Sequence, residues 1–190
     1  MTSHEIPLLA ENAAMQEPPY TTSDKELNTT GAIDATLIVP FVQSVRDVFT
    51  TMVHATPKVQ RPVVKENTRA SYDVSTVVQF SGDVCGSVVL SFQSEAAIKL
   101  VENFAGFAFS LDDNDFADAI GELGNMVAGA AKKNLNCEAS IGIPTVVIGD
   151  NHRVARLTEV PCVVVPCQTD VGDFAVEISI RSTGAAKAAA

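Results

Sequence analysis

Near the middle of the chain an acid and an amide stand three residues apart, Glu122 and Asn125, and a second acid, Asp118, precedes Glu122 by four residues. Residues three or four apart lie on the same face of an α-helix. A side-chain amide both donates and accepts hydrogen bonds and carries no charge, whereas an ionised carboxylate only accepts them. The spacing therefore predicts one helical face that carries two acids and an amide.

The neighbouring residues indicate that this face points away from the protein core. Turned by about 100° per residue from Asp118, a helix would carry Glu122, Asn125 and Gly129 within about 40° of zero. Apolar residues fall between about 80° and 220°, in a stripe wide enough to face a sheet. The members of this stripe are Ile120, Leu123, Met126, Val127, Ala130 and Ala131.

Small residues edge the polar row, with Gly121, Gly124 and Ala128 on one flank. A glycine inside a helix costs about 1 kcal/mol relative to Ala, and an asparagine roughly 0.5 kcal/mol. One interpretation is a bare surface on which another protein docks closely. The other is a solvated face whose glycines pack against a neighbouring helix. The residues alone leave both interpretations open.

The elements that would hold this helix follow from hydrophobic periodicity and turn residues. The pattern predicts helices over 36–54, 94–105 and about 114–135, the last opened by the acids of 112–115, one of which can cap it. It predicts a hairpin of strands 74–80 and 85–92 around Ser81-Gly82-Asp83, and further strands over 139–148, 159–166 and 173–181. The fold class is α+β, with an antiparallel sheet covered by long helices and a weak internal pseudo-duplication.

Length and charge define the domain organisation. The 190 residues fit one domain with two tails: an arm over 1–34, a domain over 35–182 and a flexible tail over 183–190. The arm holds one basic and six acidic residues, 1 − 6 = −5, and its mixed polar composition predicts disorder. The net charge is −10. No basic patch favours nucleic acid or an anionic membrane, and no apolar run approaches a membrane span, so we expect a cytoplasmic protein.

The cysteines and histidines show no pattern of a metal site. Cys85, Cys137, Cys162 and Cys167 form no Cys-x-x-Cys pair, and the three histidines lie far apart. We interpret the cysteines as small buried residues and predict no metal ligands in this chain.

The segment Asp118-Ala-Ile-Gly-Glu122-Leu-Gly-Asn125 resembles the Asp/Ser-x-x-x-Glu-x-x-Asn signature of the CheC/CheX/FliY chemotaxis phosphatases. The continuation to Lys132 and the segment Ile141-Gly-Ile-Pro144-Thr-Val-Val-Ile-Gly149 are similar to the CheX branch. Pro144 lies nearer to Asn125 than in the CheC pattern, and helix 36–54 has no Glu-x-x-Asn. The resemblance is therefore to CheX, without a second site of the CheC kind.

This resemblance implies a phosphatase that hydrolyses the phospho-aspartate of a CheY-type response-regulator receiver domain. The receiver would supply the divalent cation and a lysine, so the chain would need no cofactor of its own. The attack would still lack a water held in line with the breaking bond. The resemblance gives that task to Asn125 and the docking to the receiver lysine to Glu122. Supporting or docking positions would be Asp118, Gly121, Gly124 and Gly129.

Two further expectations come with the resemblance. It implies a homodimer, for which the sequence adds a valine-rich strand at 159–166 that could pair across a sheet edge. The alternative function is a non-catalytic binding or flagellar-switch-like scaffold module. Retention of both Glu122 and Asn125 argues against that alternative.

Overall fold

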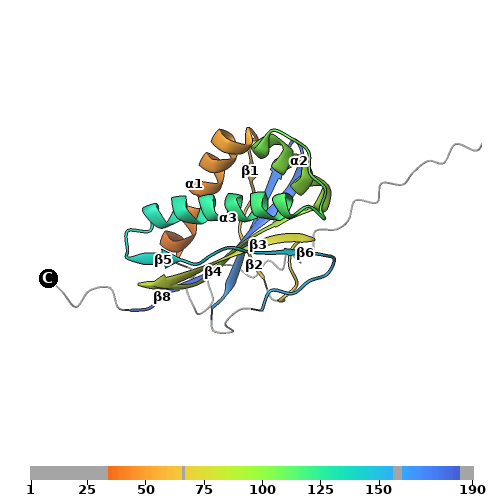
Figure 1. The fold of residues 1–190 in the computed structure, drawn as a ribbon. Helices are drawn as coiled ribbons and strands as arrows, with labels where there is room; N and C mark the ends of the chain where they lie inside the picture. Colours follow the sequence, from red (N-terminus) through yellow and green to blue (C-terminus); the bar gives the residue numbers. More distant parts are fainter. Residues whose placement is uncertain (1–33, 66, 156–159, 185–190) are drawn as a thin grey trace, which may run out of the picture.

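Long antiparallel strands with apolar residues at every second position form the centre of the molecule. The computed structural model describes residues 34–65, 67–155 and 160–184, and in this part of the chain three α-helices cover one face of an eight-stranded sheet (Figure 1). The strand order is β1-β7-β8-β4-β3-β5, with β2 also pairing with β7 and β6 with β3. The predicted α+β class with a helix-covered antiparallel sheet is confirmed.

The central strands confirm the predicted hairpin. β3 (Val74–Gly82) and β4 (Val84–Phe92) pair antiparallel, and β4 pairs on its other side with β8 (Gly172–Ser182). The strand predicted at 139–148 is instead two short strands, β5 (Ala139–Ile141) and β6 (Thr145–Ile148), both paired with β3. Pro144 stands in the gap, where its missing N–H removes nothing from the sheet.

The far edge of the sheet differs from the prediction. β7 (Cys162–Thr169) begins three residues later than expected and pairs with β8 on one side. On its other side it pairs with two short strands that the pattern did not predict, β1 (Lys58–Val59) and β2 (Val63–Lys65). The valine-rich strand is therefore not an edge, and the argument for a dimer through its exposed backbone was wrong.

The three helices begin and end close to the predicted bounds. They are α1 (Ala35–Val48), continued by a π-helical turn η1 (Phe49–Val53), α2 (Ser94–Ala105) and α3 (Asn114–Asn134). Asp34 caps α1, its carboxylate accepting from the Thr36 N–H at 2.9 Å. Asp113 occupies the cap position of α3, but its carboxylate accepts from the Ser110 N–H at 2.7 Å. The expected aspartate cap of that helix is thus replaced by a loop contact.

Between the helices and the sheet lies the hydrophobic core. Three phenylalanines from different elements stack at its centre: the ring centroids of Phe49 and Phe174 are 4.5 Å apart, and those of Phe92 and Phe174 are 5.6 Å apart. From α3 the core takes Phe116, Ile120, Leu123, Val127 and Ala131, all fully buried. The predicted apolar stripe of this helix is therefore its inner face, with Met126 and Ala130 at its margin.

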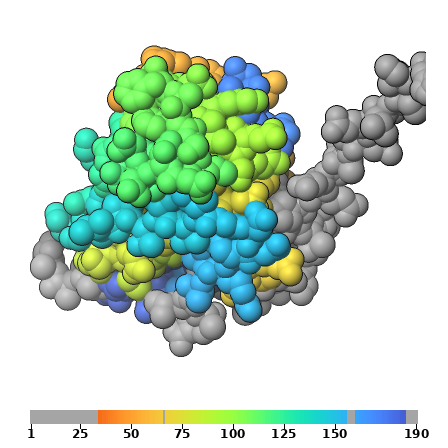
Figure 2. Space-filling model, turned by 45° about the vertical axis from the view of Figure 1, so that its right-hand side comes forward, coloured from red at the N-terminus to blue at the C-terminus, as the bar shows by residue number. Residues whose placement is uncertain are grey.

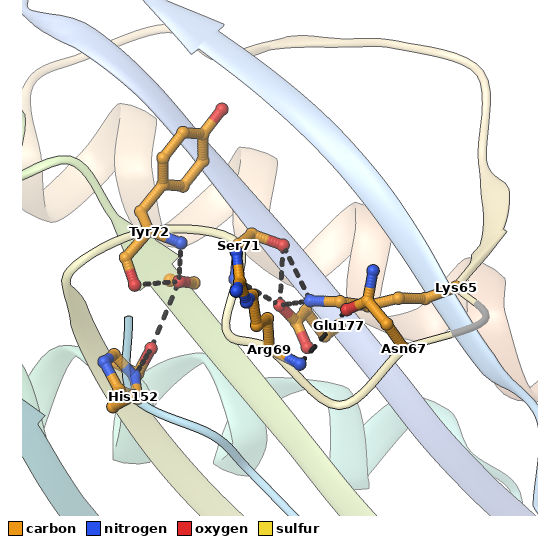
Figure 3. Close-up of polar contacts among 9 residues, drawn as sticks. Lys65, Asn67, Arg69, Ser71, Tyr72, His152 and Glu177 are labelled. Atoms are coloured by element: carbon orange, nitrogen blue, oxygen red, sulfur yellow. Dashed lines mark hydrogen bonds and ion pairs between the residues drawn. The ribbon is translucent and has the colours of Figure 1, made fainter. Parts of the chain in front are cut away.

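The other face of the sheet carries a buried polar network (Figure 3). Lys65 on β2 contacts the Glu177 carboxylate on β8 at 2.5 Å, and both side chains are almost completely excluded from solvent. The Ser71 N–H and hydroxyl donate to the same carboxylate oxygen. Since a buried charge is tolerated only when it is paired and hydrogen-bonded, this network holds the segment leading into β3 against the sheet.

The structure bounds the domain without describing the tails. β8 ends at Ser182, and Asp34 belongs to the folded unit as the cap of α1. The predicted arm, apart from Asp34, and most of the predicted C-terminal tail lie outside the described residues.

Candidate functional site on helix α3

Glu122 and Asn125 are brought together as the spacing predicted. The Asn125 Nδ2 donates to the Glu122 Oε2 at 3.3 Å. The Glu122 side chain is exposed and the Asn125 side chain is half-buried rather than fully exposed. Asp118, one turn earlier, is also exposed. The row therefore offers solvent two carboxylates and an amide whose nitrogen is oriented by its neighbour.

The row lies on the flank of α3 that adjoins the β5–β6 edge of the sheet. A Cβ added to Gly121 would lie 3.5 Å from Val146 Cγ2 and 3.9 Å from Pro144 Cβ, and one added to Gly129 would lie 4.0 Å from Ile141 Cδ1. Asn125 falls midway between the two glycines along the helix and is rotated by about 40° from each. Its side chain thus emerges above the segment that joins β5 to β6.

The glycines on the inner side of the row do not form a bare surface. Gly121 and Gly124 are buried, and a Cβ on Gly124 would come within 2.6 Å of both Cγ2 and Oγ1 of Thr76 on β3. The interpretation of these two positions as part of an open docking surface was wrong. The alternative of packing against a neighbouring helix was also wrong, because they face the sheet. Gly124 allows α3 to lie closer to β3 than a side chain would permit.

Thr76, which packs against Gly124, was not among the residues predicted from the sequence to support the site. It is fully buried, and its Oγ1 has no hydrogen-bond partner among the described residues. In the sequence it stands at an inward-facing position of β3, where a polar residue is unexpected. That mismatch was the available signal.

Within the described residues, no group of three or more His, Cys, Asp or Glu side chains is arranged to hold a metal ion. The four cysteines are all free thiols. Burial raises the pKa of the Cys167 thiol to about 12, so this residue packs as a neutral side chain. None of the described helices is long and apolar enough to cross a membrane. The polar groups of the row formed by Asp118, Glu122 and Asn125 are two carboxylates and an amide.

A family model described as chemotaxis phosphatase CheX matches residues 74–168, which contain α3 and the row of Asp118, Glu122 and Asn125. The chain belongs to the CheX family. The match begins at β3 and runs through β7, so it covers the strands that support the row as well as the row itself.

Individual relatives agree with this family. The chain is 29% identical over 156 residues to the CheY-P phosphatase CheX of Thermotoga maritima, covering 80% of this chain and all of the relative. It matches the crystal structure of CheX from Desulfovibrio desulfuricans with a TM-score of 0.68 and 32% identity, covering 77% of this chain and 98% of that one. A structure of the CheX-CheY-BeF3-Mg²⁺ complex from Borrelia burgdorferi shares the fold, with a TM-score of 0.65 and 22% identity, over 77% and 98% of the two chains.

Proposed function

We propose that this CheX-family chain hydrolyses the phospho-aspartate of a CheY-type receiver domain, with Asn125 positioning the attacking water and Glu122 docking to the receiver lysine. The observation that carries the proposal is the hydrogen-bonded Glu122–Asn125 pair on an accessible helix face. The Thermotoga relative is named as a phosphatase of CheY-P, and the Borrelia relative was solved with CheY, which supports this substrate class.

The arrangement suits a reaction in which the substrate domain brings its own electrophilic help. A Mg²⁺ ion accompanies CheY in the Borrelia complex, and we propose that the receiver likewise supplies the divalent cation here. Phosphoryl transfer then requires mainly positioning of the nucleophile. An amide can accept a hydrogen bond from the water and donate one to the phosphoryl oxygens without adding negative charge.

The Glu122 carboxylate would repel a bare phosphoryl group. In the proposal it therefore pairs with a cation, the lysine of the receiver. A receiver lysine would draw the carboxylate away from Asn125, since the 3.3 Å hydrogen bond between them is long and solvent-accessible. Docking would then release the amide toward the water. Asp118 extends the negative face by one turn. In this proposal Gly129, which is half-buried, borders the docking face, whereas Gly121 and Gly124 support it from below.

The decisive experiment follows the decay of phosphorylated CheY-type receivers from the source organism, with and without this chain. In the presence of Mg²⁺, we expect this chain to accelerate the decay of at least one phosphorylated receiver. Binding of the phosphorylated receiver without acceleration would favour the scaffold alternative instead.

We further propose that the protein acts in the cytoplasm, where such receivers work, and that it forms a homodimer.

A further inference from the structure

Beside the polar row, the corner Gly142–Pro144 between β5 and β6 carries the most exposed large apolar side chain of the described residues. Ile143 is 92% exposed, and the next, Phe107, is 63% exposed. Single exposed apolar residues are common on proteins, so exposure alone indicates little. Two properties of this position, its rigidity and its place next to Asn125, distinguish it.

The backbone of the corner is fixed on both sides. The Gly142 N–H donates to the Gln79 carbonyl at 2.9 Å, and the residues on either side pair with β3, Ile141 with Phe80 and Thr145 with Val77. The ring of Pro144 restricts its own φ. Ile143 is therefore presented to solvent from an ordered backbone, and a partner that covered it would not have to order this segment first.

The same corner runs along the flank of α3 that carries Asn125. Pro144 lies against Gly121 and Ile141 against Gly129, the two glycines that bracket Asn125 on the helix. Figure 2 shows the segment after residue 140 lying directly against α3. A protein surface that reaches Asn125 therefore lies next to this corner.

We propose that Ile143 is an apolar anchor for the receiver domain that docks on Glu122 and Asn125, an inference that rests on the proposed function. The polar row supplies charge and hydrogen bonds, but Asp118, Glu122 and Asn125 offer little apolar area. Stable interfaces combine a polar rim with buried apolar side chains near the centre. Ile143 supplies such a side chain at the point where the row meets the sheet edge.

The test measures binding of a CheY-type receiver loaded with beryllofluoride and Mg²⁺ to the full chain, together with the kinetics on the phosphorylated receiver. We expect Ile143→Ser to weaken binding about tenfold or more and to raise KM while kcat at saturating receiver stays near the wild-type value. Ile143→Leu, which restores apolar area, should bind within about threefold of wild type. Thermal melts should match, because Ile143 contributes little to the core.

Val64→Ser is the matched control, because Val64 is an exposed apolar residue of β2 at the opposite edge of the sheet. We expect it to leave receiver binding unchanged. Equal binding by Ile143→Ser and wild type, with Asn125→Ala inactive, would overturn this inference and leave the proposed function standing. A comparable loss in Val64→Ser would overturn it too, by removing its site-specificity. If the wild type neither binds nor dephosphorylates any receiver, both proposals are wrong.

Discussion

At the scale of single residues, the proposed chemistry depends on one amide and its neighbouring carboxylate. Asn125 is half-buried on the flank of α3, and its nitrogen is engaged by Glu122. A hydrogen bond of 3.3 Å in contact with solvent contributes little to stability, so the pair can exchange its partners on docking at small cost. Substitutions at these two positions should therefore change activity far more than folding.

We expect Asn125→Ala to lower the accelerated decay of the phosphorylated receiver by about 100-fold, which corresponds to ~2.7 kcal/mol of transition-state stabilisation. Alanine is the better helix former by roughly 0.5 kcal/mol, so the free energy of unfolding should stay the same or rise slightly. Asn134→Ala, at the exposed end of the same helix, serves as the control and should keep full activity. Turnover at the wild-type rate by Asn125→Ala would show that another group positions the water.

We expect Glu122→Gln to weaken binding of the receiver about fivefold, because an exposed ion pair contributes up to ~1 kcal/mol. The substitution removes the charge but keeps an oxygen that can accept from Asn125, so kcat at saturating receiver should change little. Glu102→Gln, an exposed position on α2, matches the change in net charge. Titration at two salt concentrations separates the effects: the difference between Glu122→Gln and wild type should shrink at high salt. Unchanged affinity at low salt would remove the docking role of Glu122.

At the scale of elements, the distance between α3 and the sheet determines where Asp118, Glu122 and Asn125 lie relative to the β5–β6 edge. The helix packs on β3 through Gly124, which leaves room for the buried Thr76 side chain, and on β6 through Gly121. A larger residue at Gly124 would clash with Thr76 and push α3 away from β3, whereas a Cβ at Gly121 would lie at ordinary contact distance from Val146. At Gly124 the cost of a glycine in a helix is thus offset by close helix–sheet packing.

We expect Gly124→Ala to destabilise the protein by about 1–3 kcal/mol, although alanine is favoured in helices by about 1 kcal/mol. The added Cβ would lie 2.6 Å from Thr76 Cγ2 and Oγ1. Gly129→Ala is the control: its nearest neighbour is 4.0 Å away, so this substitution should be neutral or stabilising. Urea unfolding measures both, and adding Thr76→Ala to Gly124→Ala should recover part of the loss. Equal stability of Gly124→Ala and wild type would show that α3 does not depend on this close approach.

At the scale of the whole molecule, the domain is defined by its two faces and two edges. The helices cover one face of the sheet, and the Lys65–Glu177 network helps to close the other (Figures 1 and 3). The edges are formed by β1 and β2 at one side and by β5 and β6 at the other. Because β7 is paired on both sides, the free edges of the sheet in the described part of the chain lie at those outer strands.

We expect removal of residues 1–33 to leave both catalysis and melting temperature nearly unchanged. This segment carries most of the arm's net charge and few large apolar residues, so little burial would offset the ~1–2 kcal/mol per residue that ordering it costs. Asp34 has to be kept, because it caps α1. A variant with Asp34→Ala in the truncated chain should lose about 1 kcal/mol further. Clear destabilisation by the truncation alone would show that the arm packs on the domain.

We expect the chain to sediment as a dimer at tens of micromolar, as the family resemblance implies. A measured mass of twice the 20.0 kDa of one chain would indicate a dimer, and a mass of 20.0 kDa would indicate a monomer. If the dimer is found, Lys substitutions at Val147 on β6 and at Val64 on β2 distinguish the two outer edges. A monomeric mass at that concentration would contradict the prediction.

From the amino-acid sequence alone, the elements with local signals could be predicted. Helical periodicity placed Glu122 and Asn125 on one face of α3, and alternation around Ser81-Gly82-Asp83 determined the central hairpin. Both patterns depend on side chains within a few residues of one another, which is why they can be read without a fold. The family resemblance followed from this helix segment and from the segment Ile141–Gly149.

Which residues of different elements face one another became clear only from the three-dimensional packing. The sequence pattern around a helical glycine does not show whether the glycine faces solvent or a sheet. The contact between Gly124 and Thr76 joins residues 48 positions apart in the sequence. Strands as short as β1 and β2 are too short to show a periodicity. They form because their backbone groups pair with those of β7. Likewise, Pro144 interrupts the strand at 142–144. The position of this corner beside Asn125 arises from the packing of α3 on β5 and β6. These features are set by long-range pairing, for which a single sequence carries no local signal.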